Sequence, residues 1–341
     1  MKTFVPFNKI ATQKITIVDG LHPHNLCLSH WKGANNLEGI AADTSGEIVL
    51  KAIESNYPGV KNNLVSATHF DIDGFVGVYS LFNPETALTC REELIAMARI
   101  GDFREYKPIN KIDDYALKLC CWMNKVEKDR FYRPFGSKDE IENCVEKFHY
   151  FLSVFTHVLE NIDDYKKDWE LEYNSVHNGI AKEVSSQKHK SIGLIKKKFE
   201  CPPHYYALFN STEGFDIVLA IYPDNKYELE YKYTTWIDLA SRTNLPRIDL
   251  NPLANDLNAM EVSEFEWQVD SISDTGPVLR LESSELTKAD RYANPSERTI
   301  YSSSIDSNKL EKIVLSFFTN SYKNIAPKNN WTWGEVRSLN H

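Results

Sequence analysis

The sequence lacks cysteine pairs with the spacing of a metal or redox motif. Its six cysteines stand at positions 27, 90, 120, 121, 144 and 201, and no Cys-x-x-Cys occurs. This excludes a zinc ribbon or a thioredoxin-like site of the usual spacing. Free thiols are typical of proteins in a reducing compartment, so we expect a cytoplasmic location.

Apolar segments that would direct the chain to a membrane are also missing. No run of about 18 consecutive apolar residues occurs, which is the length that a membrane-spanning helix needs. Residues 1–8 lack the long apolar core of a secretory signal. We therefore expect no membrane partner.

An excess of positive charge is absent as well. The chain has 39 Lys and Arg against 48 Asp and Glu, which gives a formal net charge of −9. Such a balance excludes non-specific binding to long duplex nucleic acid. It is compatible with a small anionic substrate or a short oligonucleotide in a metal-lined cleft, and with a homodimer.

The composition is that of a folded protein with two domains. The 341 residues are 42% hydrophobic and 12% aromatic, and domains average about 150 residues. We expect an α/β fold in which residues 1–170 form a parallel-sheet domain with a helical extension. Residues 171–200 are interpreted as a connector, and residues 201–341 as a smaller α+β domain, with a cleft between the two domains.

The first half alternates between strand-like and helix-like patterns. Short β-prone runs lie at 14–19, 25–31 and 64–69, and helical patterns lie at 43–54, 74–82 and 90–100. This alternation predicts a parallel sheet. Residues 110–173 have the spacing of further helices.

The second half has a different pattern. Aromatic-rich or alternating runs predict antiparallel strands at Tyr205–Asn210, Phe215–Tyr222 and Tyr227–Tyr233. Pro223–Lys226 is typical of a turn between the last two strands. Helices are expected at Leu250–Met260 and Asp306–Asn320, and the lysines at 196–198 are expected to face solvent.

Three ligand-type side chains follow the predicted strand at 64–69. His69, Asp71 and Asp73 stand at alternate positions, and Gly74, which we expect to supply backbone freedom, closes the stretch. In an open α/β sheet, functional groups collect where strands end and helices begin. Imidazole and carboxylates suit Mn²⁺, Mg²⁺, Fe²⁺ or Zn²⁺. We predict a metal site with these three ligands, in which Asp73 can bridge two ions and take part in catalysis.

Other side chains could complete this site. His30 follows another predicted strand, so we assign it a catalytic role in orienting the substrate or transferring a proton, with Trp31 as a substrate contact. Asp102 follows a predicted helix and is either a further metal ligand or a cap. Asp43 has the same two interpretations, and there we favour a helix N-cap.

Two arginines of the second half are candidate substrate ligands. Arg242 and Arg247 flank a loop after an aromatic strand. Guanidinium groups bind phosphate or carboxylate through paired hydrogen bonds, but ordinary ion pairing is an equal alternative. Glu146 and His149 have the spacing of a di-iron motif, for which partly buried helix residues are the favoured alternative.

Residues 64–82 resemble the first motif of the DHH phosphoesterase superfamily, through His69-Phe-Asp-Ile-Asp-Gly74 after a β-run and before an apolar segment. The resemblance implies a parallel α/β domain, a smaller C-terminal domain and a Mn²⁺-type two-metal centre that hydrolyses phosphodiesters or phosphoanhydrides. The name-giving Asp-His-His does not occur in the sequence.

The whole chain resembles a poorly characterised bacterial family known mainly as a domain of unknown function. The matching features are Ser29–Trp31, Asp43–Ser45, His69–Gly74, Gly101–Phe103, Tyr227–Tyr231, Trp236, Ser241–Arg242 and Pro246–Leu250. They span both predicted domains, so this resemblance supports the architecture without implying an activity.

The leading hypothesis is a divalent-metal-dependent, phosphoesterase-like hydrolase. Its substrate would be a phosphorylated small molecule or a short nucleic acid, attacked by a metal-activated water, with Mn²⁺ as the favoured ion and Mg²⁺, Fe²⁺ or Zn²⁺ as alternatives. A second hypothesis is a metalloenzyme without phosphate chemistry, such as an amide hydrolase or an iron oxygenase. A third is a ligand-binding homologue of a phosphoesterase that has lost catalysis.

Overall fold

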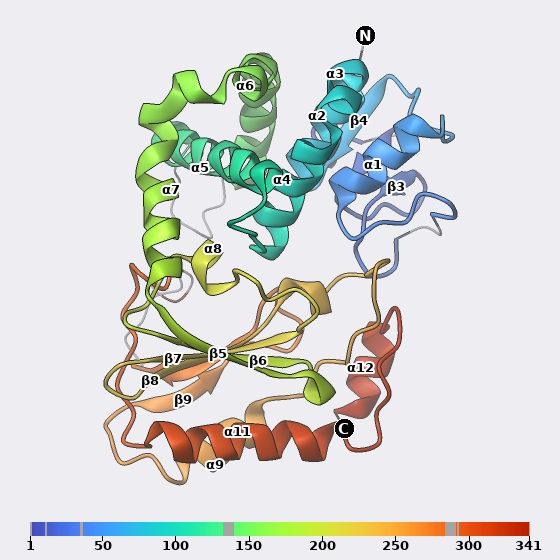
Figure 1. The fold of residues 1–341 in the computed structure, drawn as a ribbon. Coiled ribbons are helices and arrows are strands. Elements are labelled where there is room, and N and C mark those ends of the chain that lie inside the picture. Colours follow the sequence, from blue (N-terminus) through green and yellow to red (C-terminus); the bar gives the residue numbers. More distant parts are fainter. Residues whose placement is uncertain are drawn as a thin grey trace. The chain divides into compact units, whose positions relative to one another are not determined.

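The computed structural model of the chain divides into two compact units (Figure 1). It describes residues 2–10, 12–34, 37–131, 140–283, 291 and 293–340, with the backbone alone for residues 140–143. The first unit comprises Met1–Asn174 and Leu239–Ser241, and the second comprises Ser175–Asp238 and Arg242–His341. The mixed α/β class predicted from the sequence is confirmed.

A parallel sheet of four described strands forms the base of the first unit, in the order β1-β4-β2-β3. The strands are β1 (Thr3–Phe4), β2 (Thr16–Val18), β3 (Leu26–Leu28) and β4 (Leu64–Ala67). Every pairing in it is parallel. The carboxyl ends of β2, β3 and β4 therefore meet at one edge, as the sequence predicts.

Helices alternate with these strands and then follow them. They are α1 (Ser45–Glu54), α2 (Ile72–Phe82), α3 (Pro84–Thr89), α4 (Arg91–Phe103), α5 (Lys111–Phe131), α6 (Glu140–Glu160) and α7 (Lys166–Ala181). Single 3-10 turns lie at η1 (Phe7–Lys9) and η2 (Ile162–Tyr165). Helix α2 packs against both α1 and α4, so the residues at the start of α1 and α2 and at the end of α4 can share one site.

A glycine allows α2 to lie directly on the sheet. A β-carbon at Gly77 would lie 2.5 Å from Val18 Cγ1 and 3.2 Å from Val49 Cγ2. Both valines are fully buried, so neither can move away at low cost. The short distance between α2 and β2 therefore depends on the missing side chain.

Replacing Gly77 with Ala is expected to lower the free energy of unfolding by about 1–3 kcal/mol, because it overpacks this contact. Urea unfolding followed by circular dichroism measures the change. Gly334→Ala is the control, since Gly334 is exposed and its β-carbon would meet only Thr332 Oγ1 at 3.9 Å. A Gly77→Ala protein as stable as the wild type would contradict the packing argument.

The second unit is built on a mixed sheet of six described strands, in the order β5-β6-β7-β8-β10-β9. They are β5 (Glu183–His189), β6 (Leu194–Phe199), β7 (Ile217–Tyr222), β8 (Lys226–Tyr231), β9 (Glu266–Val269) and β10 (Val278–Glu282). Only β6 and β7 pair in parallel among them. Asp224 and Asn225 have φ of 60° and 55°, as a tight hairpin turn requires, which confirms the predicted turn.

Helices pack on this sheet to form the core of the second unit. They are α8 (Tyr205–Leu208), α9 (Asn251–Asn258), α11 (Ser307–Ser321) and α12 (Trp333–Leu339), with 3-10 turns η3 (Lys190–Ile192) and η4 (Tyr233–Thr235). Leu253 of α9 and Phe318 of α11 share a buried cluster with Leu219 and Leu229 of the sheet. The predicted helices at 250–260 and 306–320 are thus confirmed.

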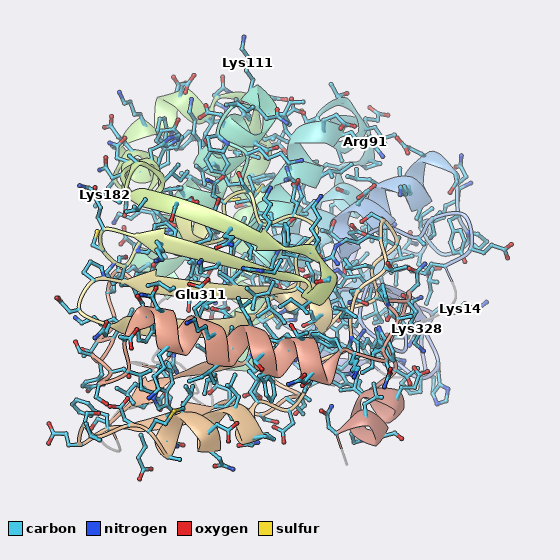
Figure 2. All side chains as sticks on the ribbon, turned by 60° about the horizontal axis from the view of Figure 1, so that its bottom comes forward. Lys14, Arg91, Lys111, Lys182, Glu311 and Lys328 are labelled. Atoms are coloured by element: carbon cyan, nitrogen blue, oxygen red, sulfur yellow. The ribbon has the colours of Figure 1, made fainter. Side chains whose placement is uncertain are left out.

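The interpretation of residues 171–200 as a connector is wrong, because the end of α7 and the strands β5 and β6 together occupy most of them. Strand β5 is an exposed edge strand, and it lacks the apolar alternation that would have revealed it. In β6, Lys197 is buried beside Glu183 Oε2 at 3.0 Å. Lys196 Nζ lies 2.5 Å from Glu311 Oε1, and Figure 2 labels Glu311 on α11. These two lysines therefore do not face solvent as predicted.

Two further differences from the sequence predictions concern short elements. Tyr205–Asn210 is not a strand, since residues 205–208 form α8 and the His204 side chain accepts a hydrogen bond from Tyr206 N at its start. Glu146 and His149 lie exposed on α6, which gives no support to the di-iron alternative.

A membrane crossing would need a long apolar helix, and the described part of the chain contains none.

Candidate metal centre

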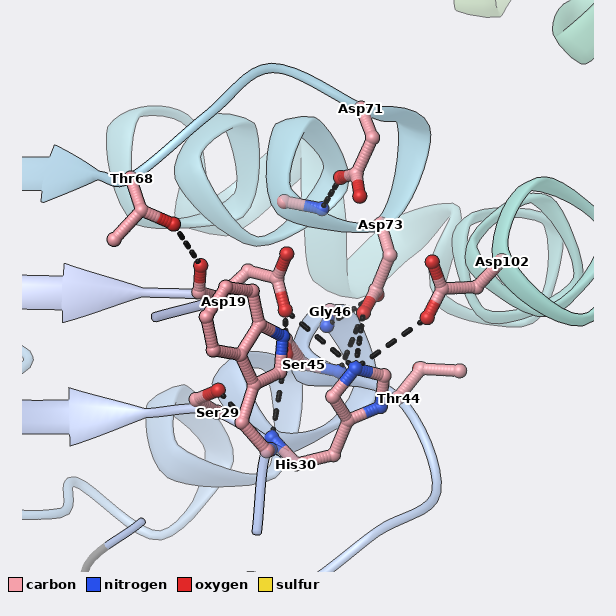
Figure 3. Close-up of polar contacts among 12 residues, drawn as sticks. Asp19, Ser29, His30, Thr44, Ser45, Gly46, Thr68, Asp71, Asp73 and Asp102 are labelled. Atoms are coloured by element: carbon pink, nitrogen blue, oxygen red, sulfur yellow. Dashed lines mark hydrogen bonds and ion pairs between the residues drawn. The ribbon is translucent and has the colours of Figure 1, made fainter. Parts of the chain in front are cut away.

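Acidic and imidazole side chains from separate elements meet at the carboxyl edge of the parallel sheet (Figure 3). Asp19 directly follows β2, and His30 follows β3. Asp73 lies in the first turn of α2, and Asp102 in the last turn of α4. We call these four residues the inner group. The structure thus brings together three residues singled out from the sequence and one, Asp19, that was not.

The His30 ring has one nitrogen engaged and the other directed at carboxylates. Its Nδ1 lies 2.6 Å from the main-chain oxygen of Asp43. A carbonyl oxygen can only accept, so Nδ1 carries the proton. Its Nε2 lies 3.5 Å from Asp19 Oδ1, 3.8 Å from Asp73 Oδ2 and 3.4 Å from Asp102 Oδ2. These distances exceed the length of an N–H···O hydrogen bond, about 2.7–3.2 Å.

The same distances fit atoms that share a cation. Ligands about 2.1 Å from an octahedral ion lie about 3.0 Å apart in neighbouring positions and about 4.2 Å apart in opposite ones. The three separations around His30 Nε2 lie between these limits. Metal-bound histidines commonly donate their other ring N–H to a carbonyl oxygen, as His30 does to Asp43.

The N-terminus of α1 fixes two of the carboxylates. Ser45 N donates to Asp73 Oδ2 at 2.8 Å, and Gly46 N donates to Asp73 Oδ1 at 2.7 Å. The positive end of the helix dipole favours the negative charge there. The Ser45 hydroxyl donates to Asp19 Oδ1 at 2.7 Å. Both carboxylates are therefore held before any ligand binds.

Asp102 has a buried oxygen without a hydrogen-bond donor. Its Oδ2 has no hydrogen-bond partner among the described residues. Burial, and then the charges of Asp73 and Asp71, raise the pKa of Asp102 well above its ordinary value. Asp102 lies at the carbonyl end of α4, where a negative charge does not cap a helix. A buried oxygen of this kind is stable as an acid or as a cation ligand.

His69 and Asp71 form a second cluster with Asp19, which we call the outer group. Asp71 Oδ1 accepts from Gly74 N at 2.8 Å as the N-cap of α2, and its Oδ2 lies 2.8 Å from His69 Nε2. The Thr68 hydroxyl donates to the carbonyl of Asp19 at 2.9 Å and lies 3.0 Å from His69 Nδ1. Since that hydroxyl proton is used, both His69 nitrogens donate and the ring is charged.

The charge on His69 follows from its neighbours. Burial lowers its pKa, but the charges of Asp71 and Asp19 outweigh this and raise the pKa to about 10. The side chain is 43% exposed, against 1% for His30. His69 therefore lies at the rim of the centre, whereas His30 lies inside it.

Asp19 belongs to both groups. Its Oδ1 lies 3.5 Å from His30 Nε2, and its Oδ2 lies 3.5 Å from His69 Nε2. Among the described residues, clusters of three or more ligand-type side chains are found here alone, and each contains Asp19. Burial, followed by the charge of Asp71, raises the pKa of Asp19 to about 7. Its φ of 47° lies in the left-handed region, which few residues with a side chain adopt.

Gly74 makes room for Asp19. A β-carbon at Gly74 would lie 3.0 Å from Asp71 Oδ1 and 3.3 Å from Asp19 Cβ. Its φ lies outside the left-handed region that favours glycine. The expectation that Gly74 supplies backbone freedom is therefore wrong, because its role is to leave space.

Trp31 and Asp43, two further residues predicted from the sequence, lie next to the centre. The Trp31 ring lies 5.7 Å from that of His69, so Trp31 remains a candidate substrate contact at the rim. Asp43 is not the N-cap of α1 as we expected. That position is held by Thr44, whose side chain accepts from Glu47 N.

The two predicted substrate arginines lie in the second unit and have protein partners there. Arg242 Nη2 lies 2.7 Å from Asp216 Oδ1. Arg247 is 1% exposed and donates to Thr235 Oγ1 and to the main-chain oxygens of residues 272, 274 and 275. Burial lowers its pKa to about 10. These contacts give Arg247 a structural role, and Arg242 as a substrate ligand stays a prediction.

Comparison with known proteins identifies one family. The model of the Family of unknown function (DUF6687) matches residues 1–329, which include the whole of the candidate centre. No curated protein and no solved structure matches the chain. The resemblance of residues 64–82 to the DHH phosphoesterases therefore stays a hypothesis.

Proposed function

The chain belongs to this family of unknown function, and we propose that it is a divalent-metal-dependent hydrolase of phosphoesters. The observation that carries the proposal is the position of Asp19, which directs one carboxylate oxygen toward each imidazole of the centre. A carboxylate between two ligand sets can bridge two ions. Pairs of ions about 3.5–4 Å apart are typical of phosphatases and nucleases.

The donor set supports Mn²⁺ or Mg²⁺. Ligand atoms of Asp19, His30 and Asp73 lie within 4.8 Å of one another, as do those of Asp19, His69 and Asp71, so each set offers two carboxylates and one imidazole. Asp102 adds a carboxylate 3.4 Å from His30 Nε2. Oxygen-rich sets suit Mn²⁺ and Mg²⁺, whereas iron oxygenases use two histidines and one carboxylate. Mg²⁺ is commonly bound by one or two carboxylates together with a substrate phosphate. The iron-oxygenase alternative is thus less well supported.

The residues of the centre would have separate tasks. Divalent ions would lower the pKa of a bound water and neutralise a phosphoryl group. Asp19, His30 and Asp73 would hold one ion, and His69 and Asp71, with Asp19, would hold the other. Asp102, beside His30 Nε2, would be a further ligand of the first ion after a small movement of its side chain. Trp31 at the rim would contact the substrate. In this proposal His30 is a ligand, and the role in proton transfer predicted from the sequence is not needed.

Metal analysis and a substrate panel test the proposal. Protein purified with chelator and reloaded with Mn²⁺ is expected to hold about two ions per chain, the number typical of such hydrolases. It is expected to cleave one or more of bis-p-nitrophenyl phosphate, dinucleotides, cyclic nucleotides, sugar phosphates and pyrophosphate. Asp71→Asn is expected to lose the outer ion.

Asp306→Asn serves as the control, because Asp306 caps α11 in the second unit. It should keep both ions and full activity. A wild-type protein that binds no divalent ion would overturn the proposal. Turnover of amides without turnover of any phosphoester would replace it by the amide-hydrolase alternative.

A further inference from the structure

Three residues from the second half of the sequence fold with the first unit. Leu239–Ser241 belong to that unit, although the chain on either side of them belongs to the second. The donors of this segment converge on one carboxylate. Ala240 N and Ser241 N each donate to Asp43 Oδ1 at 2.8 Å, and the Ser241 hydroxyl donates to Asp43 Oδ2 at 2.5 Å.

The main chain of Asp43 supports the inner group at the same time. Its carbonyl oxygen accepts the Nδ1 proton of His30 at 2.6 Å. The next residues along the chain, Ser45 and Gly46, donate to Asp73. The carboxylate of residue 43 is therefore anchored by residues 240 and 241, while its carbonyl sets the direction of the His30 ring.

We propose that Asp43 is a positioning residue and that Leu239–Ser241 form a clamp that fixes it. The clamp holds the Asp43 carbonyl, the carbonyl orients His30, and the orientation of Nε2 sets the affinity of the inner group for its ion. This inference rests on the metal centre proposed above. Outer partners of metal ligands typically change metal affinity about 10–100-fold when they are removed.

If Leu239–Ser241 only anchor a loop, their removal should leave metal affinity unchanged. Hydrogen bonds from a loop to a partly exposed carboxylate can stabilise the fold without any effect on a ligand. The two roles are separated by metal affinity, because a general loss of stability leaves the affinity of the folded protein unchanged. The chain offers a matched contact, since Ser304 donates to Glu261 Oε1 from its N at 2.9 Å and its hydroxyl at 2.6 Å.

The experiment measures the Mn²⁺ dissociation constant of the full chain by electron paramagnetic resonance, with the visible spectrum of Co²⁺ as a report on ligand geometry. Asp43→Ala is expected to weaken binding of the ion at the inner group about tenfold or more and to change the Co²⁺ bands. Ser241→Ala should act in the same direction with a smaller effect. Asp43→Asn should restore near wild-type affinity, because its amide can accept from both N–H groups and donate to Ser241.

Ser304→Ala is expected to bind Mn²⁺ as the wild type does. Equal weakening by Ser304→Ala and Ser241→Ala would overturn the clamp, as would wild-type affinity in both Asp43→Ala and Ser241→Ala. If the wild type itself binds no Mn²⁺, it is the metal centre that fails. Thermal unfolding shows which variants are folded, and Ser241→Ala, which removes one hydroxyl, keeps the test decisive if Asp43→Ala does not fold.

Discussion

Replacement of Asp19 by Asn is expected to lower Mn²⁺-dependent hydrolysis by at least about 1000-fold, or about 4 kcal/mol of transition-state stabilisation. The amide has the shape of the carboxylate, but it has no charge and only one acceptor oxygen. It can still accept the hydrogen bond from Ser45 that Asp19 Oδ1 accepts. It cannot serve the inner and the outer group together.

The same substitution is expected to leave the metal-free protein at least as stable as the wild type at neutral pH. Asp19 is 2% exposed. Burial is the main cause that raises the pKa of Asp73 and Asp102, and the charge of Asp19 raises both further. Removing that charge therefore relieves repulsion among buried carboxylates. Loss of function without loss of stability separates a ligand from a structural residue.

Kinetics in Mn²⁺, metal content per chain and urea unfolding together test this prediction. Asp216→Asn is the control, since Asp216 is also buried but pairs with Arg242 in the second unit. It should lose stability and keep its metal. An Asp19→Asn protein that retains the metal content and turnover of the wild type would rule out Asp19 as a shared ligand.

The place of the centre could be predicted from the sequence, because strand ends of a parallel sheet meet at one edge. That rule selected His30 and the stretch at 69–74. It could also have selected Asp19, which is the last residue of the predicted strand at 14–19. The β-prone pattern places this residue within the strand, and the left-handed turn that directs its side chain into the centre has no signal in the local sequence.

Other features depend on contacts between distant segments. Nothing in the sequence near Asp73 shows that the first N–H groups of α1 hold it. The clamp on Asp43 joins residues 197 and 198 positions apart. In the second unit, Lys196 and Lys197 of β6 are buried because acidic side chains and a carbonyl oxygen from other segments accept from them. The lysine-rich composition of residues 196–198 alone suggests that these side chains face solvent.

Metal-free protein is expected to become less stable as the pH rises from about 5 to about 8, within the range set by carboxyl pKa values. Burial raises the pKa of Asp19 and of Asp73 to about 7, from ordinary values of 3.8. The folded state therefore binds protons that the unfolded state has released. Stability is highest where both groups are protonated, and it falls as the pH rises through their folded pKa values.

Divalent ions are expected to reverse this slope, because they bind the deprotonated carboxylates of the folded state. Calorimetry at several pH values, with chelator or with Mn²⁺, measures both slopes. The midpoint shift caused by Mn²⁺ should grow with pH, by about 2–4 °C for each kcal/mol in a unit of this size. Asp73→Asn should flatten the metal-free slope. A metal-free midpoint that rises with pH and is unaffected by Asp73→Asn would show that these carboxylates are not held in the folded state as described.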